Sequence, residues 1–170
     1  MGAFADMNSA TRGYVSNYLR PGRYLARIDE CVSFDKKGVG RMWKNTLTII
    51  AVEEGDHKVG EQVQTFFKLD PRYPDMFYGK IMGFIAGVMG VTDDEVGEDE
   101  TNEVLDPEGN PLLGVVTLVT AVASASKKST NDDGSPKMFT NYSWGTGLDN
   151  TEIADAIGEE AVERFFPNGL

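Results

Sequence analysis

Residues 24–34 have the sequence YLARIDECVSF, and their pattern decides the predicted fold class. The even positions are apolar except for Glu30, while Arg27, Asp29 and Ser33 occupy odd positions. Successive side chains of a β-strand point to opposite faces, so this period of two predicts a strand with one face in a core. The preceding Pro21-Gly22 is a turn signal that marks where the strand begins.

Two further strands are predicted directly after the first. Residues 35–40, DKKGVG, have the composition of a flexible hairpin tip. The alternation then continues over 41–52 and again over 61–69, where one face carries Val63, Thr65, Phe67 and Leu69. These three strands are predicted to form an antiparallel meander.

The hydrophobic period changes after Pro74. A helix is predicted because apolar residues recur there at helical spacing, namely Phe77, Ile81, Phe84, Ile85 and Val88. Gly90 is a natural C-terminal stop for it. An acidic loop is then expected over 92–111, followed by strands over 112–123 and 138–144. Helical spacing returns within 149–170 and predicts an acidic C-terminal helix or tail.

The predicted element order is three strands, one helix and two strands. This is the order of the OB-fold, a five-stranded Greek-key barrel whose sheet face and loops bind oligonucleotides. The sequence therefore predicts a mainly β protein with an OB-fold-like antiparallel barrel over 21–148 and a helix between its third and fourth strands. Residues 1–20 are predicted to form an N-terminal arm, and 149–170 a C-terminal helix.

The net charge of −11 is unevenly distributed along the chain. Residues 93–108 carry nine acids and no base, and 149–170 carry six acids against the single base Arg164. The rest of the chain holds 12 acids and 15 bases. Because blocks of like charge are usually solvated loops or tails, the body of the domain is predicted to be mildly basic.

Residues able to carry catalysis are scarce in this sequence. His57 is the only histidine and is expected to be a solvated turn residue. Cys31 is the only cysteine, so no internal disulfide is possible, and it is expected to be a buried structural thiol. No Cys/His cluster has the spacing of metal ligands, and no cofactor or metal is expected. We therefore expect a binding protein rather than an enzyme.

Two absences bear on the expected location of the protein. No apolar run approaches the roughly 20 residues that span a bilayer, and the N-terminal residues lack the pattern of a signal peptide. The single cysteine agrees with a reducing compartment. We therefore expect a cytoplasmic protein that does not interact with membranes.

Basic and aromatic side chains occur together in the predicted strands and hairpins. A single strand of nucleic acid is held by a basic groove and by aromatic rings on which its bases stack. The candidate nucleic-acid-binding residues are Arg20, Arg23, Arg27, Lys36, Lys37, Arg41, Trp43, Lys44, Phe66, Lys68, Lys127, Lys128, Tyr142 and Trp144.

Each part of this candidate interface also has a purely structural interpretation. Tyr142 and Trp144 are compatible with a place in the core. Phe66 is compatible with a cover formed by the N-terminal arm or the C-terminal helix. The basic hairpin alone is compatible with a solvated turn, and the pattern leaves Trp43 unassigned. The direction in which these four aromatic side chains point therefore decides between the two interpretations.

Several short phrases of the sequence resemble bacteriophage single-stranded DNA-binding proteins with an OB-fold. They are LRPGRY at 19–24, RMWK at 41–44, VGE at 59–61, the helix at 76–90 and NYSW at 141–144. The resemblance covers residues 19–148. It implies a largely sequence-independent protein that protects single-stranded DNA in phage replication or recombination, located in the host cytoplasm if the chain is phage-encoded.

The same resemblance implies a role for the acidic C-terminal segment. In such proteins a flexible acidic tail recruits replication enzymes and competes with DNA for the basic groove. Here the acids of 149–170 alternate with apolar residues at helical spacing, which departs from that pattern. The segment is therefore either a docking tail for replication or recombination proteins or a helix packed on the barrel.

Two other hypotheses remain open from the sequence. The net charge and the uncovered apolar groups are compatible with a protein-interaction or virion-structural β-barrel that binds no nucleic acid. A homodimer is compatible with the same features. The acidic block at 93–108 is compatible with a Mg²⁺-dependent nuclease, although it lacks the spacing and central glycine of a calcium loop.

Overall fold

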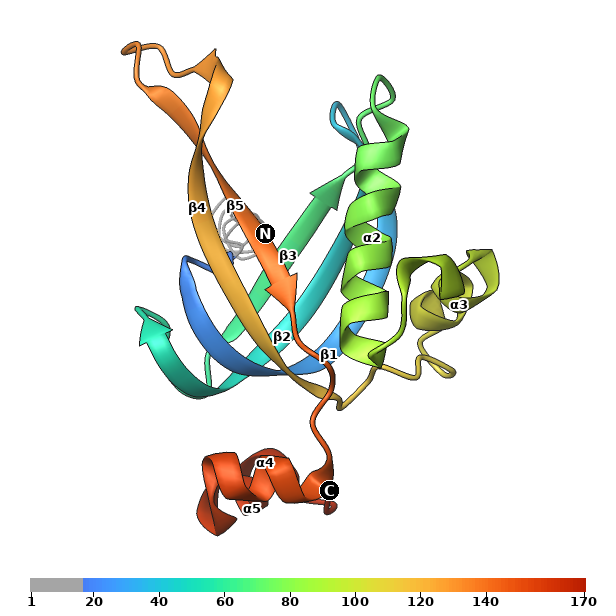
Figure 1. The fold of residues 1–170 in the computed structure, drawn as a ribbon, viewed down its shortest axis with the longest axis vertical. Helices are drawn as coiled ribbons and strands as arrows, with labels where there is room; N and C mark the ends of the chain where they lie inside the picture. The colour runs from blue at the N-terminus through green and yellow to red at the C-terminus, as the bar shows by residue number, and fades with distance from the viewer. Residues whose placement is uncertain (1–16) are drawn as a thin grey trace, which may run out of the picture.

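A computed structural model describes residues 17–170 of the chain (Figure 1). Within this range it holds one antiparallel sheet of five strands in the order β3-β2-β1-β4-β5. The strands are β1 (Gly22–Lys36), β2 (Gly40–Gly55), β3 (Gln62–Lys68), β4 (Val116–Thr130) and β5 (Pro136–Trp144). The mainly β class and the five antiparallel strands are thereby confirmed, while most of the predicted N-terminal arm, residues 1–16, lies outside the described residues.

The sheet is open between β3 and β5, and we call this opening the seam. Within residues 17–170 no backbone pairing joins these two strands. Residues 17–19 occupy part of the free edge of β3 instead: the N–H of Gln64 donates to the carbonyl of Asn17 at 2.8 Å, and the N–H of Leu19 to that of Gln64 at 3.0 Å. The predicted antiparallel barrel is therefore corrected to a curved, open sheet.

An irregularity in β1 changes which side chains face the core. Tyr24, Ala26 and Ile28 are fully buried, as the alternation predicted. The pairing with β2 then shifts register between Ile28 and Glu30, and Cys31 is buried where Val32 was expected. A bulge adds one residue to one strand and so exchanges its faces beyond that point. This explains why Glu30 broke the period of two.

Helix α2 (Pro74–Met89) packs against the end of β5, as Figure 1 shows. The helix was predicted, and its apolar stripe contributes Phe77, Ile81, Phe84, Ile85 and Val88 to the core. It ends at Gly90, whose left-handed φ of 70° suits glycine. Gly87 allows the close approach to β5, because a Cβ placed there would lie 2.7 Å from the carbonyl oxygen of Trp144.

The acidic segment is not a simple loop, and this prediction was wrong in part. It contains a 3₁₀ turn (Asp93–Glu95) and the helix α3 (Glu98–Leu105). The carboxylate of Glu100 accepts a hydrogen bond from the N–H of Gly97. Acids in the first turn also stabilise the helix, because they lie near the positive end of its dipole. Val104 is fully buried and fastens α3 to the core.

The C-terminal segment forms two short helices on the outer face of the sheet. The sequence predicted a C-terminal helix or tail here, and the structure has the helices α4 (Asn150–Ile157) and α5 (Glu159–Phe165), separated by Gly158. Ile153 and Phe165 complete a second core cluster with residues of the sheet, namely Leu25, Ile50 and Val116. Both faces of β1 are therefore covered. Among the described residues, no helix is long and apolar enough to cross a membrane.

Candidate nucleic-acid interface

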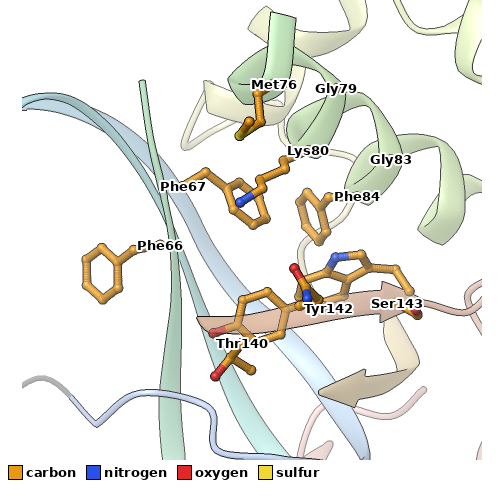
Figure 2. A pocket seen from close by; sticks show the side chains of 12 residues that line it. Phe66, Phe67, Met76, Gly79, Lys80, Gly83, Phe84, Thr140, Tyr142 and Ser143 are labelled. Atoms are coloured by element: carbon orange, nitrogen blue, oxygen red, sulfur yellow. The ribbon is translucent and has the colours of Figure 1, made fainter. Parts of the chain in front are cut away.

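A groove of about 390 Å³ lies along the seam, between β3, β5 and α2 (Figure 2). Its polar and apolar lining is provided by Phe66, Phe67, Met76, Gly79, Lys80, Gly83, Phe84, Thr140, Asn141, Tyr142, Ser143 and Trp144. The groove exists because the sheet does not close and because Gly79 and Gly83 leave one face of α2 without large side chains. It collects residues from three elements that are far apart in the sequence.

Four aromatic rings form a continuous row along this groove. The centroids of Phe67 and Tyr142 are 6.5 Å apart, those of Tyr142 and Trp144 are 6.1 Å apart, and those of Trp144 and Phe84 are 4.6 Å apart. Phe67 and Phe84 are buried, whereas Tyr142 and Trp144 are half-buried. The two residues of β5 are thus wall residues of the groove, packed against the core on one side and accessible on the other.

The hydroxyl of Tyr142 stays neutral over a wide pH range. Burial raises the pKa of this phenol above its ordinary value, with a smaller contribution from Tyr18. A neutral phenol places no negative charge in the groove. It therefore does not repel a phosphate group.

The face of α2 that borders the groove carries Gly79, Lys80 and Gly83. A Cβ added at Gly79 or Gly83 would meet no atom within 4 Å, so these glycines leave open space. Lys80 extends from the helix into this space (Figure 2), and among the described residues no carboxylate forms an ion pair with it. Lys80 was not among the candidate residues predicted from the sequence. The spacing of Gly79, Lys80 and Gly83 on one helical face is the signal that identifies it.

A second aromatic pair lies on the other side of β3. The ring of Phe66 points away from α2, as Figure 2 shows, and the ring of Tyr18 lies 5.3 Å from it. Phe66 is half-buried, and Tyr18 is 56% exposed. Phe66 is thus an outward residue that the N-terminal segment covers in part. Tyr18 was not selected from the sequence, although it is an aromatic residue just before the first strand.

Two of the candidate residues, Trp43 and Arg27, stabilise the fold and do not form part of an accessible binding surface. The ring of Trp43 is 1% exposed, and its Nε1–H donates to Oδ1 of Asn45 at 2.7 Å. A buried ring offers no surface on which a base can stack, so its predicted place in the interface is corrected. The guanidinium of Arg27 pairs with Asp29 at 2.7 Å and donates to the carbonyl of Phe165, which ties α5 to the sheet.

The other basic candidates fall into two groups. Arg23, Arg41 and Lys44 form ion pairs with Glu53, Asp35 and Glu30 at 3.4–3.5 Å. No such partner is found among the described residues for the exposed set Arg20, Lys36, Lys37, Lys68, Lys127 and Lys128. Lys36 and Lys37 stand at the β1–β2 hairpin, and Lys127 and Lys128 on the β4–β5 hairpin. Both hairpins project toward the same end of the molecule (Figure 1).

The remaining chemistry-bearing residues are structural. His57 was expected to be solvated, but it is 3% exposed and both ring nitrogens have partners. Cys31 is buried as predicted, and this burial raises the pKa of its thiol to about 12, which keeps it protonated. Within residues 17–170 no group of three or more His, Cys, Asp or Glu side chains is arranged to hold a metal ion.

Comparison with known proteins adds no assignment to this geometry. No protein-family model matches the chain. A search of curated proteins found no significant match. The interpretation of the groove therefore depends on its own side chains.

Proposed function

We propose that this protein binds single-stranded DNA, largely without sequence preference, along the seam. The observation that carries the proposal is the pair of half-buried rings at the seam, Tyr142 and Trp144, next to Lys80, for which the described residues provide no ionic partner. Every base has a π-face, so stacking on rings such as Tyr142 and Trp144 tolerates any sequence and contributes roughly 1–3 kcal/mol per base. Lys80, which lines the groove, is placed to contact the phosphates between stacked bases.

The arrangement of elements supports this proposal. We infer an OB-fold-like domain, because the helix α2 stands between the third and fourth strands and β1 pairs with both β2 and β4. In that fold, oligonucleotides lie along strands 2 and 3 and contact the 1–2 and 4–5 loops. In this chain those two hairpins carry the exposed pairs Lys36–Lys37 and Lys127–Lys128.

The placement of the acids also favours the seam as the DNA-binding surface. Helix α3 lies on the far side of α2 from β5, and α4 and α5 lie at the opposite end of the molecule from the hairpin tips (Figure 1). The two acidic blocks are therefore kept away from the groove. A chain with a net charge of −11 can in this way present a locally basic surface to a polyanion.

A titration of labelled oligo-dT with the full chain at low salt tests the proposal. Fluorescence anisotropy should rise to saturation, and the affinity should fall steeply with salt because phosphate contacts release counterions. Oligo-dA should bind within about tenfold of oligo-dT if stacking dominates. No binding at tens of micromolar protein would overturn the proposal. A parallel titration with oligo-U measures the preference for DNA over RNA.

The biological role that fits this activity is protection of single-stranded DNA during phage replication or recombination. Glu159, Glu160 and Glu163 remain exposed on α5, although the helix itself packs on the sheet. We propose that replication or recombination proteins are recruited through this packed acidic surface rather than through a free tail. Binding of a partner should then survive substitutions in the seam groove.

One observation favours a second candidate function, that of a protein-interaction domain. The β4–β5 hairpin exposes Val122, Met138 and Phe139 by 56%, 61% and 52%. Exposed apolar side chains of this size on a projecting hairpin are typical of a surface that another protein covers. Light scattering with and without oligo-dT separates the two functions, because a large assembly indifferent to DNA supports the second one.

A further inference from the structure

A second groove, of about 710 Å³, lies on the opposite side of α2 from the seam. Its walls are α2, α3 and the ends of β1, β2 and β3 next to the first hairpin. Most of its lining is apolar, with Trp43 and Phe77 at the base and Tyr78, Met82, Val96 and Leu105 around them. We call it the α2–α3 groove. Its volume is within the range of about 300–1,000 Å³ that binding sites occupy.

The margin of this groove is acidic. Glu98 lines it directly, and the segment that forms its α3 wall carries nine acids and no base over residues 93–108. The one basic side chain among its lining residues, Arg41, is paired with Asp35 at 3.4 Å. An apolar floor inside an acidic margin repels phosphates and attracts cations. The groove is therefore complementary to a different kind of ligand from the seam.

We infer that the α2–α3 groove binds an apolar peptide segment flanked by lysine or arginine residues, supplied by another protein. Burial of one or two large side chains on Met82, Tyr78 and Leu105 provides the affinity, as anchor residues do in most interfaces. The acids of α3 select the basic flanks and orient the segment. This site does not depend on the proposed DNA-binding function, because α2 separates the two grooves and presents different residues to each.

The inferred preference for basic flanks can be tested with two matched peptides. One fluorescein-labelled peptide has Leu and Phe anchors flanked by lysines, and in the other the lysines are replaced by glutamates. Anisotropy titration of the full chain, in the absence of DNA, should show that the lysine-flanked peptide binds at least about tenfold more tightly. Equal affinity of the two peptides would overturn the inference.

Substitutions locate the site. Met82→Glu places a charge on the apolar lining and should weaken the lysine-flanked peptide about tenfold, whereas Met76→Glu, on the seam side of the same helix, should leave its affinity unchanged. Glu98→Lys, on an exposed residue, should weaken the lysine-flanked peptide and strengthen the glutamate-flanked one. Unchanged peptide affinities in both Met82→Glu and Glu98→Lys contradict the inference.

The affinity of each variant for oligo-dT shows whether a substitution has unfolded the protein or has removed only the peptide site. Glu98→Lys and Met82→Glu should bind oligo-dT as the unmodified chain does, because neither residue lines the seam groove. If oligo-dT binding is absent in the unmodified chain, the proposed function fails and the peptide result still stands. If DNA binds and the peptides do not discriminate by charge, only the inference about the α2–α3 groove fails.

Discussion

The imidazole of His57 accepts a hydrogen bond at Nε2 from the backbone N–H of Arg20, over 2.9 Å. Nε2 must therefore be unprotonated, and Nδ1 carries the proton that it shares with the carboxylate of Glu61 at 2.7 Å. This pair ties residues 17–20 to the turn between β2 and β3. It thereby holds Tyr18 beside Phe66, at the edge of the proposed DNA-binding surface.

Replacing His57 by alanine should destabilise the fold and weaken DNA binding. The change leaves the N–H of Arg20 without its partner, removes the ring that packs 5.3 Å from Tyr24 and frees Glu61. Loss of a buried hydrogen-bonding side chain costs about 1–3 kcal/mol, measurable by urea unfolding. Lys58→Ala, at the exposed neighbouring position, is the control and should change neither quantity. A stability equal to that of the unmodified chain would show that the contact contributes nothing.

The same contact predicts a dependence of stability on acid. The hydrogen bond to His57 lowers the pKa of Glu61 from its ordinary 4.5 to about 2, with help from the N–H of Lys58 and from Asn17. The carboxylate of Glu61 is thus ionised at a lower pH in the folded state than in the unfolded state. Its ionisation therefore stabilises the fold fully above pH 4.5, and this stabilisation is lost as pH falls toward 2. Urea midpoints of Glu61→Gln should therefore vary less between these pH values than those of the unmodified chain.

Two glycines of α2 should respond oppositely to alanine. Gly87→Ala puts a Cβ 2.7 Å from the carbonyl oxygen of Trp144 and should destabilise the protein by forcing the helix off β5. Gly83→Ala meets no atom within 4 Å and should raise the free energy of unfolding by up to about 1 kcal/mol through helix propensity. Thermal unfolding of the two variants compares them directly, and the same sign of change in both would contradict the packing described.

Substitutions at the seam should lower the affinity for DNA without unfolding the protein. Tyr142→Ala removes a stacking ring and should weaken oligo-dT about tenfold or more, a loss of roughly 1–3 kcal/mol. Lys80→Ala should reduce the magnitude of the slope of log affinity against log salt by about 0.7, as for one lost phosphate contact. Lys44→Ala, whose ammonium is paired with Glu30, is the matched control and should leave that slope nearly unchanged.

The C-terminal helices should be needed for stability but not for DNA binding. Phe165 is 7% exposed in the second core cluster, so Phe165→Ala should cost about 3 kcal/mol in urea unfolding. Its oligo-dT affinity per folded molecule should be unchanged, because the residue lies far from the seam. Glu163→Ala, on the exposed face of the same helix, should leave stability within about 0.5 kcal/mol of the unmodified chain. A variant with normal stability would indicate a free tail.

Much of the element pattern follows from periodicity alone. The period of two in β1 and the helical stripe of α2 predict those elements because each buries a single face. The sequence could not predict the bulge near Glu30, since which residue is left unpaired depends on the facing strand. It also could not predict α3, because Val104 and Leu105 are the only apolar residues in this helix, and Val104 finds a core only after the chain has folded.

The candidate interface, like the fold, could be predicted only in part from the sequence. Residue type selected the aromatic and basic positions, of which Tyr142 and Trp144 form a wall of the seam groove, whereas the ring of Phe66 lies on the other side of β3 beside Tyr18. Type alone did not separate Trp43 from them, although its odd position is in phase with Leu47 and Ile49, which face the core. Lys80 and Tyr18 were missed because their neighbours in space, β5 and β3, are distant in sequence.

The sequence by itself determined the β class, the change of period after Pro74 and the separation of acidic from basic segments, because these are local properties of spacing and composition. Only the tertiary structure decided that the sheet stays open, that His57 is buried and that α2 lies between two grooves of different charge. Those features depend on contacts between strands and loops that are distant in the sequence. No local pattern of spacing or composition relates the residues that make these contacts.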